Sequence, residues 1–488
     1  MCCGLRPPGN AGCRVSGVLP IPCGKRGRRD LLERVNDLLW GPGMLALLLG
    51  TGLLLTVRLR FLPWRRLGYA LRTALGREAR RGGAHGVSPF SALMTALAAT
   101  VGTGNIVGVS TALVAGGPGA LLWMELSALL GMGTMFTESL LSARYRRRGP
   151  DGRWTGGPMY VMEAAFGPRA GRALGAAFSL AAVGAALGVG GMAQANAITE
   201  VLGDAFGLPP GPVGLTVAAL ALLGILGGLG SISRVTTVLV PAMAAVYLAA
   251  GLAVILGNLG NLPSGLAMIV REALSPRAAA GGAAGIWAAA RWGVARGVFS
   301  NEAGLGSAGI AAASADGADP VRQGYISMTG AFFDTMIICT VTGLAICCSG
   351  VLGTVDSLGR PVNGGALTIL AFRTVLGDLG AGCLAVSVTL FAFSSILGWA
   401  FQGETAFVYL TRGHVRRLYR PLFLLAVLWG ADQPVEAVYL LADLCNAAMC
   451  VPNLLCLAAL GGEAARMAGC GGGIRRGAGR PAALGRGR

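Results

Sequence analysis

The sequence predicts an all-α, polytopic membrane protein with about eleven transmembrane helices, two of them discontinuous. Its 488 residues are 54% hydrophobic and 13% charged, with a mean hydropathy of +0.64. Soluble domains carry about 25% charged residues, so this composition excludes a soluble fold. Apolar runs of a length that suits membrane crossing recur near residues 40–57, 88–115, 118–143, 171–198, 212–230, 235–257, 284–312, 324–350, 379–410, 418–431 and 435–461.

Two of these runs contain residues that a spanning helix ordinarily avoids. TVGTGN at 100–105 and FSNEAG at 299–304 bring Gly, Thr, Asn and Glu to mid-membrane depth. Non-helical backbone survives there only where it lines a cavity or is buried in protein. Paired breaks of this kind are typical of the binding sites of secondary transporters.

The position of the breaks predicts an inverted repeat. If the run at 40–57 is an extra N-terminal helix, ten runs remain, and the first run of each group of five carries a break. Crossing an odd number of spans inverts the second group relative to the first. We therefore expect repeat one at about 88–257 and repeat two at about 284–461, within a transporter domain over 35–462. A disordered N-terminal extension (1–34) and a basic cytoplasmic tail (463–488) would flank this domain.

Arginine distribution predicts the orientation in the membrane. The net charge of +18 comes from arginines that cluster in short connections beside alternate apolar runs and in the tail. This pattern follows the positive-inside rule and predicts a cytoplasmic C-terminus in the cell membrane, not nucleic-acid binding. Lys25, Arg26, Arg28 and Arg29 depart from it, because they would lie outside.

The first break is suited to hold both an ion and a zwitterion. Unwinding between Thr100 and Asn105 frees carbonyl groups for Na⁺ or an ammonium group, and N–H groups for a carboxylate. Gly102 and Gly104 let the backbone approach a ligand closely, and Asn105 adds a neutral side-chain oxygen. The alternative is a flexible kink or a glycine packing face.

The second break carries the acidic residue Glu302. A charged residue near mid-bilayer costs about 2.5–3.5 kcal/mol on insertion scales, so it usually faces a partner or a cavity. Glu302 is expected either to pair with Arg296 or another buried base, which would hold the broken helix in shape, or to act directly in transport by carrying a proton.

Two further polar sets lie in apolar runs. The side chain of Gln194 could bind a zwitterion, since it has both a hydrogen-bond donor and an acceptor, or it could form a hydrogen bond between helices. Asn196 is two residues further on and therefore does not lie on the same helix face as Gln194. Ser394 and Ser395 either complete a sodium site with carbonyls of the first break or bond back to their own helix.

Other classes of function find little support. Seven cysteines in or near the apolar runs lack CxxC spacing and are interpreted as small buried hydrophobes. His85 and His414 are the only histidines, and both lie in basic connections, which argues against an intramembrane enzyme. A channel would need a continuous pore, and two paired breaks favour a carrier.

Several stretches carry a family resemblance: TALAATVGTGNIVGV (95–109), GGPGALLWMELSALLGMGTMFTESLLSARYR (116–146), GGPMYVMEAAFG (156–167), RGVFSNEAGLGSA (296–308), FDTMIICTVTG (333–343), LFAFSSILGW (390–399) and LADLCNAAMCVPNLLCLAAL (441–460). They follow one another in family order, and the chain resembles the alanine or glycine:cation symporters, also called sodium:alanine symporters. It departs from the family at Gly309, where proline is usual, and within AAAS (311–314), which lacks a common histidine.

The resemblance implies a leucine-transporter-like fold and Na⁺-driven uptake of alanine or glycine, without an organic cofactor. Proton coupling is the alternative within transport. By analogy, the sodium sites would involve Ala98, Thr100, Val101, Asn105, Ser394 and Ser395. The amino acid would be held by Thr103, Gly104, Gln194, Phe299, Ser300 and Asn301, with Gly102 and Glu302 in structural or coupling roles.

Overall fold

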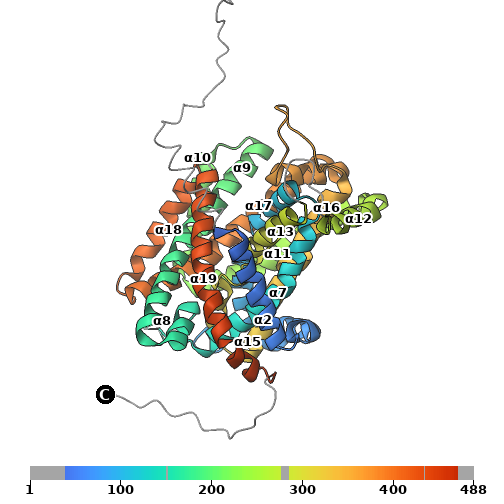
Figure 1. The fold of residues 1–488 in the computed structure, drawn as a ribbon. Coiled ribbons are helices and arrows are strands. Elements are labelled where there is room, and N and C mark those ends of the chain that lie inside the picture. Colours follow the sequence, from blue (N-terminus) through green and yellow to red (C-terminus); the bar gives the residue numbers. More distant parts are fainter. Residues whose placement is uncertain (1–38, 150–151, 276–284, 434, 471–488) are drawn as a thin grey trace, which may run out of the picture.

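The computed structural model describes residues 39–149, 152–275, 285–433 and 435–470, and nearly all of them are helical (Figure 1). Within these ranges, six helices are long and apolar enough to cross a membrane, and one bent helix pair makes a seventh. The predicted all-α membrane fold is confirmed. The count of eleven spans and the inverted repeat stay predictions, and the expected N-terminal extension lies outside the described residues.

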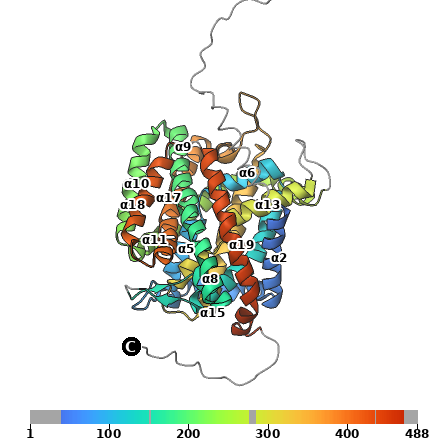
Figure 2. The same cartoon turned by 60° about the vertical axis from the view of Figure 1, so that its left-hand side comes forward.

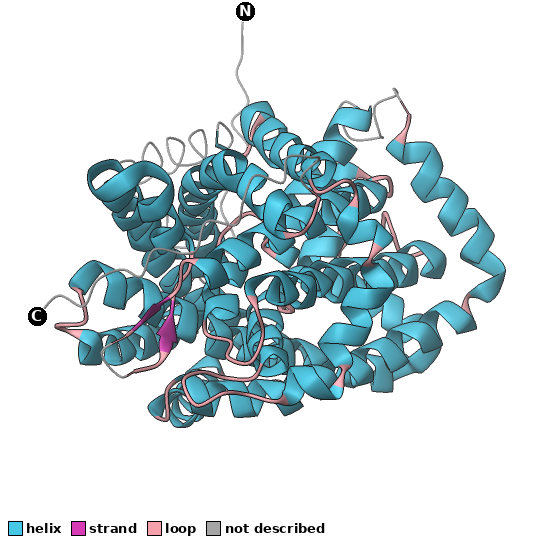
Figure 3. Ribbon diagram, turned by 90° about the horizontal axis from the view of Figure 1, so that it is seen from below, coloured by secondary structure: helices cyan, strands magenta, loops and turns pink. Residues whose placement is uncertain are grey.

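The first part of the chain contains the following elements: α2 (Pro42–Arg58), α3 (Leu62–Arg65), α4 (Leu67–Leu75), η1 (Arg77–Arg80), α5 (Pro89–Thr100), η2 (Thr103–Asn105), α6 (Val107–Gly116), α7 (Ala120–Arg144), β1 (Arg147–Arg148), β2 (Trp154–Thr155), α8 (Pro158–Ala185), η3 (Ala186–Ala193), α9 (Gln194–Phe206), α10 (Pro210–Leu226) and α11 (Leu229–Gly257). The short strands pair antiparallel and lie at one edge of the molecule (Figure 3).

The second part contains η4 (Leu259–Asn261), α12 (Leu262–Ala273), α13 (Gly285–Asn301), α14 (Ser307–Ala313), α15 (Pro320–Ala331), η5 (Phe332–Cys339), α16 (Thr340–Ser349), α17 (Gly364–Thr411), α18 (Arg416–Gly430) and α19 (Val435–Met467). The elements η3 and η5 are π-helical segments inside longer helices, a feature that is frequent at functional sites. Helices α8 and α17 each contain a kink, at Gly167 and Gly377.

Every predicted apolar run falls on one or more of these helices. The runs did not predict α4 and α12, because both are short and amphipathic rather than continuously apolar. Helix α19 also extends to Met467, past the expected domain end at 462.

The broken helices lie in the interior and belong to two buried apolar clusters, one of which includes Ala99 and Ile310 and the other Ala98 and Val109. Helix α7 packs against α13, α14 and α15. Helix α17 packs against α5, α8, α9 and α11 (Figure 2). On the outside, Leu215, Leu223 and Val238 are 64%, 66% and 70% exposed. Such exposed apolar side chains are stable against lipid, which fits a membrane protein.

The start of α5 and the end of α14 are joined directly. Val87 and Ala315 form a parallel β-bridge, and the backbone N–H of His85 donates to Asp316 Oδ2 at 3.0 Å. That hydrogen bond favours the ionised carboxyl group and lowers the pKa of Asp316. The connections of the two broken helices are therefore fixed to each other at one end.

Candidate functional site

The first predicted break is present. Helix α5 ends at Thr100, Val101 and Gly102 are not helical, and the pair Pro89–Thr100 and Thr103–Gly116 is bent by 61°. The side chain of Asn105 stabilises the turn, because its Oδ1 accepts a hydrogen bond from the Gly102 N–H at 2.9 Å.

The second predicted break separates α13 from α14. Glu302, Gly304 and Gly306 all have positive φ angles, of 57°, 92° and 95°. This left-handed backbone suits glycine and is uncommon for a side chain such as that of Glu302. Both predicted interruptions are thus confirmed as breaks in the helical backbone.

The two breaks lie against each other. A Cβ atom on Gly104 would lie 3.4 Å from both Phe299 Cδ1 and Ser300 Cα. The two breaks are therefore in direct contact at Gly104, where a methyl group would just touch the second break and a longer side chain would meet it. The structure therefore brings Gly104 next to Phe299 and Ser300, and Thr103 precedes Gly104 in the same turn.

Asp334, on the π-helical segment η5, links the two breaks. Its Oδ1 accepts from Asn105 Nδ2 at 2.8 Å, and its Oδ2 accepts from Ser300 Oγ at 2.7 Å and Thr335 Oγ1 at 2.9 Å. Asn301 Nδ2 donates to Thr335 Oγ1 at 3.0 Å. All five residues are buried, and the donors to the carboxylate are neutral.

Sequence reasoning missed Asp334 and Thr335 as site residues. The signal was an aspartate within the apolar run 324–350, which should have been weighed as an intramembrane charge like Glu302.

Gln194, Ser395 and Gly102 form the side of the site that faces α9 and α17. A Cβ atom on Gly102 would lie 2.5 Å from Ser395 Oγ and 3.6 Å from Gln194 Oε1. Gln194 Nε2 donates to the Val189 carbonyl at 3.1 Å. Among the described residues, the buried atoms Gln194 Oε1 and Thr103 Oγ1 have no hydrogen-bond partner. Seventeen buried side-chain atoms of the described residues lack such a partner, and these two lie where the first break meets α9 and α17, so a ligand bound there could satisfy both.

Ser394 bonds back to its own helix and also contacts the first broken helix. Its Oγ lies 2.9 Å from the Phe391 carbonyl and 3.3 Å from the Ala98 carbonyl of the first break. Ser395 Oγ donates to the Phe391 carbonyl at 3.1 Å. Both serines therefore form hydrogen bonds within their own helix, and Ser394 also contacts the carbonyl of Ala98, which is one of the groups proposed to bind the ion.

The predicted pairing of Glu302 with Arg296 is wrong. Arg296 lies over the rings of Trp292 and Phe299, and in the described part of the chain it makes no ion pair with Glu302. Glu302 lies just past the end of α13, with a left-handed backbone, so its side chain does not continue the helical positions from which Arg296 could reach it. The Glu302 carboxyl group instead lies near Ser307 and Trp399.

A different carboxylate holds the second break in shape. Glu138 of α7 accepts from the N–H groups of Gly306 and Gly309 at 3.2 and 2.8 Å, and from Asn453 Nδ2 at 2.9 Å. Asn453 Nδ2 also donates to the Gly304 carbonyl at 2.9 Å. Glu138 thus caps the N-terminus of α14, where a negative group is favourable.

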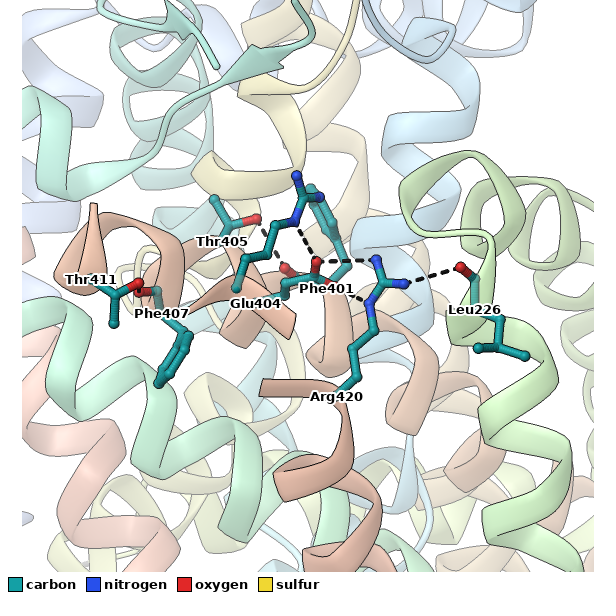
Figure 4. Close-up of polar contacts among 8 residues, drawn as sticks. Leu226, Phe401, Glu404, Thr405, Phe407, Thr411 and Arg420 are labelled. Carbon is teal, nitrogen blue, oxygen red and sulfur yellow. Dashed lines mark hydrogen bonds and ion pairs between the residues drawn. The ribbon is translucent and has the colours of Figure 1, made fainter. Parts of the chain in front are cut away.

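A second polar cluster lies at the arginine-rich end, where a hollow of about 580 Å³ borders α8, α14 and α17. Glu404 accepts from Arg416 Nε at 2.8 Å and from Arg420 Nε at 3.1 Å, and Arg420 Nη1 donates to the Leu226 carbonyl at 3.0 Å (Figure 4). These contacts join α17, α18 and the end of α10.

Comparison with known proteins identifies the family of the chain. Residues 26–469 match the sodium:alanine symporter family. The chain belongs to this family. As a sodium:alanine symporter family member, it is 41% identical to the sodium/alanine symporter AgcS of Methanococcus maripaludis over 437 residues, which cover 89% of this chain and 95% of AgcS. It is 36% identical to the probable sodium/glutamine symporter GlnT of Bacillus subtilis, with 88% of each chain covered.

The fold comparison extends to a solved structure. The structure is similar to the crystal structure of MhsT in complex with L-phenylalanine, with a TM-score of 0.54. The matched part covers 79% of this chain and 99% of the MhsT chain, and the two sequences are 14% identical. This likeness shows a leucine-transporter-like fold. The sodium:alanine symporter family member is therefore a multi-pass membrane protein and a secondary transporter, not an enzyme.

Proposed function

We propose that this transporter moves a small neutral amino acid, alanine or glycine, together with Na⁺ across the plasma membrane by alternating access. The supporting observation is the contact between two broken helices next to the unsatisfied, buried atoms Thr103 Oγ1 and Gln194 Oε1. A zwitterion supplies the donor and acceptor groups that such atoms lack.

The amino acid would lie between the breaks. Its carboxylate would accept from the freed N–H groups at Thr103 and Gly104, where a half-helix begins. Gln194 and the backbone of Phe299–Asn301 would orient its ammonium end. The two breaks are in contact at Gly104 and Phe299, which favours a small amino acid such as alanine or glycine.

Na⁺ would be held by neutral oxygens of the first break and of α17. Carbonyls of Ala98, Thr100 and Val101, with the hydroxyls of Ser394 and Ser395, are hard oxygen ligands of the kind that such a cation prefers. Asn105 would extend this set toward Asp334, whose negative charge would offset the positive charge of the ion.

Proton coupling is the second candidate, and one observation favours it. Glu302 is buried, and its Oε2 has no hydrogen-bond partner among the described residues. A buried carboxyl group without a cationic partner is more stable when it carries a proton.

Alternating access would follow from the five-plus-five inverted repeat, with one extra N-terminal helix, that the sequence predicts. The break between α13 and α14 supports this architecture, because it repeats the break between α5 and α6 in the second half. The hollow beside α14 would provide the path to the arginine-rich side.

The test is uptake of labelled alanine into proteoliposomes at fixed pH, with Na⁺ replaced by choline in the matched arm. We expect uptake to fall at least about tenfold without Na⁺, because the empty ion site would leave its carbonyls unpaired. Undiminished uptake in choline, with loss on collapse of a pH gradient, would instead establish proton coupling.

A competition panel identifies the amino acid. Unlabelled alanine, glycine, serine and glutamine are added in excess to labelled alanine uptake. Inhibition by alanine and glycine but not glutamine is expected, whereas stronger inhibition by glutamine would contradict the small-substrate proposal.

A further inference from the structure

We propose that a basic hollow where α2 and α19 end binds the phosphate headgroup of an anionic phospholipid. The hollow has a volume of about 410 Å³. Arg60, Arg65 and Arg66 line it, together with Tyr69, Tyr325 and Cys470. It is separate from the broken helices, so this inference does not depend on which solute is carried.

The charge of the basic hollow is not compensated within the described chain. The residues that line it include three arginines and no carboxylate, and none of these arginines forms an ion pair with a described residue. In the larger hollow, by contrast, Arg147 and Arg416 pair with Glu163 and Glu404. Arginine forks match phosphate oxygens well, so an anion bearing phosphate fits the uncompensated hollow.

The backbone that carries these arginines is strained. Arg60 and Phe61 are consecutive non-glycine residues with φ angles of 52° and 58°. Neighbouring hydrogen bonds hold the turn: Trp64 Nε1 donates to the Leu129 carbonyl at 2.9 Å, and Arg58 Nη1 donates to the Ala458 carbonyl at 2.6 Å. Left-handed conformations of such residues persist where the surrounding structure requires them, and they concentrate at functional sites.

The surroundings favour a lipid headgroup over a soluble phosphate. Phe61, Trp64 and Tyr69 are 41%, 40% and 50% exposed, beside the end of the apolar helix α2. Aromatic side chains at the end of a membrane helix mark the headgroup level. Basic pockets between helices at this level bind anionic lipid headgroups. The ends of α2 and α19 lie together at the lower edge of the molecule (Figure 1).

The experiment measures binding to the purified full-length protein in a neutral detergent by thermophoresis. The probes are dioctanoyl phosphatidylglycerol, dioctanoyl phosphatidylcholine and inorganic phosphate. We expect phosphatidylglycerol to bind at least about tenfold more tightly than phosphatidylcholine, because only its headgroup carries a net negative charge.

Variants locate the binding to the basic hollow. R60Q/R65Q/R66Q is expected to lose the preference for phosphatidylglycerol, whereas R60K/R65K/R66K, which keeps the charge but not the guanidinium forks, retains part of it. The matched control R72Q removes one arginine from the exposed face of α4, outside the hollow, and should bind as the wild type does. If the triple Gln variant does not purify as a folded protein, R66Q is measured, with an expected loss of about threefold.

Two results would overturn the inference. An unchanged preference for phosphatidylglycerol in the Gln variants would remove the site from the basic hollow. Binding of inorganic phosphate at these arginines, with no preference between the two lipids, would show that the source of the phosphate is soluble and not a membrane lipid.

Discussion

A substitution at Gly102 tests whether the Ser395 hydroxyl contributes to the proposed sodium site. A Cβ atom at this position would lie 2.5 Å from Ser395 Oγ, and the nearest other contacts are at 3.5 Å or more. The backbone at Gly102 is extended, so alanine fits the conformation and only the serine hydroxyl has to move. We expect Gly102→Ala to fold but to raise the Na⁺ concentration for half-maximal uptake about fivefold, roughly 1 kcal/mol.

The matched control for this measurement is Gly108→Ala. A Cβ atom on Gly108, in the second half of the same broken helix, meets nothing within 4 Å. Sodium dependence in this variant should equal that of the wild type. An unaltered sodium dependence in Gly102→Ala would show that the Ser395 hydroxyl does not contribute to the ion site.

For single residues, the sequence predicted which polar side chains belong to the breaks but not which side chains they contact. Asn105 and Ser300 were predicted from their place in the breaks, yet their meeting at Asp334 depends on how η5 packs between them. Glu302 was expected to pair with Arg296, and the nearby aromatic rings hold that arginine instead. Pairing between residues distant in sequence is a property of the fold, which single-sequence patterns do not record.

The broken helix α13–α14 depends on a side chain from another element. Glu138 of α7 accepts three hydrogen bonds, two of them from N–H groups at the start of α14. Glu138→Ala would leave these donors unpaired in the interior. We expect it to lower the free energy of unfolding by about 3 kcal/mol or more, measured from the thermal or denaturant midpoint in detergent.

Glu78→Ala provides the control for Glu138→Ala. Glu78 is also a hydrogen-bonded carboxylate, 2.6 Å from Arg322, but its side chain is 72% exposed. Surface ion pairs contribute under about 1 kcal/mol, so its midpoint should change little. Equal shifts in the two variants would mean that Glu138 does not have the proposed role in holding the break.

Element by element, continuous apolar runs were sufficient to predict the long helices, and glycine with buried polar residues was sufficient to predict both breaks. The amphipathic helices α4 and α12 were missed, because a search for apolar runs does not detect a helix with one exposed polar face. The π-helical segments η3 and η5 were missed as well, since an insertion of this kind leaves no mark in hydropathy.

For the whole molecule, the arrangement of the helix ends separates two faces with different charge. The connection between α16 and α17 lies at the upper edge, and the ends of α2 and α19 lie at the lower edge (Figure 1). In the upper connection, Asp356 and Arg360 pair with each other at 3.0 Å, so that loop adds no net charge. The lower face includes Arg60, Arg65 and Arg66. The positive-inside rule therefore predicts that the lower face is cytoplasmic.

This orientation is tested by a short epitope inserted in each of two connections. One insertion follows Leu358, which is 72% exposed between α16 and α17, and the other follows Gly413, between α17 and α18. Because α17 separates the two sites, we expect antibody to label the first in intact cells and the second only after permeabilisation, with alanine uptake retained in both. The reverse pattern would place the arginine-rich face outside. Labelling of both sites in intact cells would mean that α17 does not cross the membrane, which would contradict the inverted repeat.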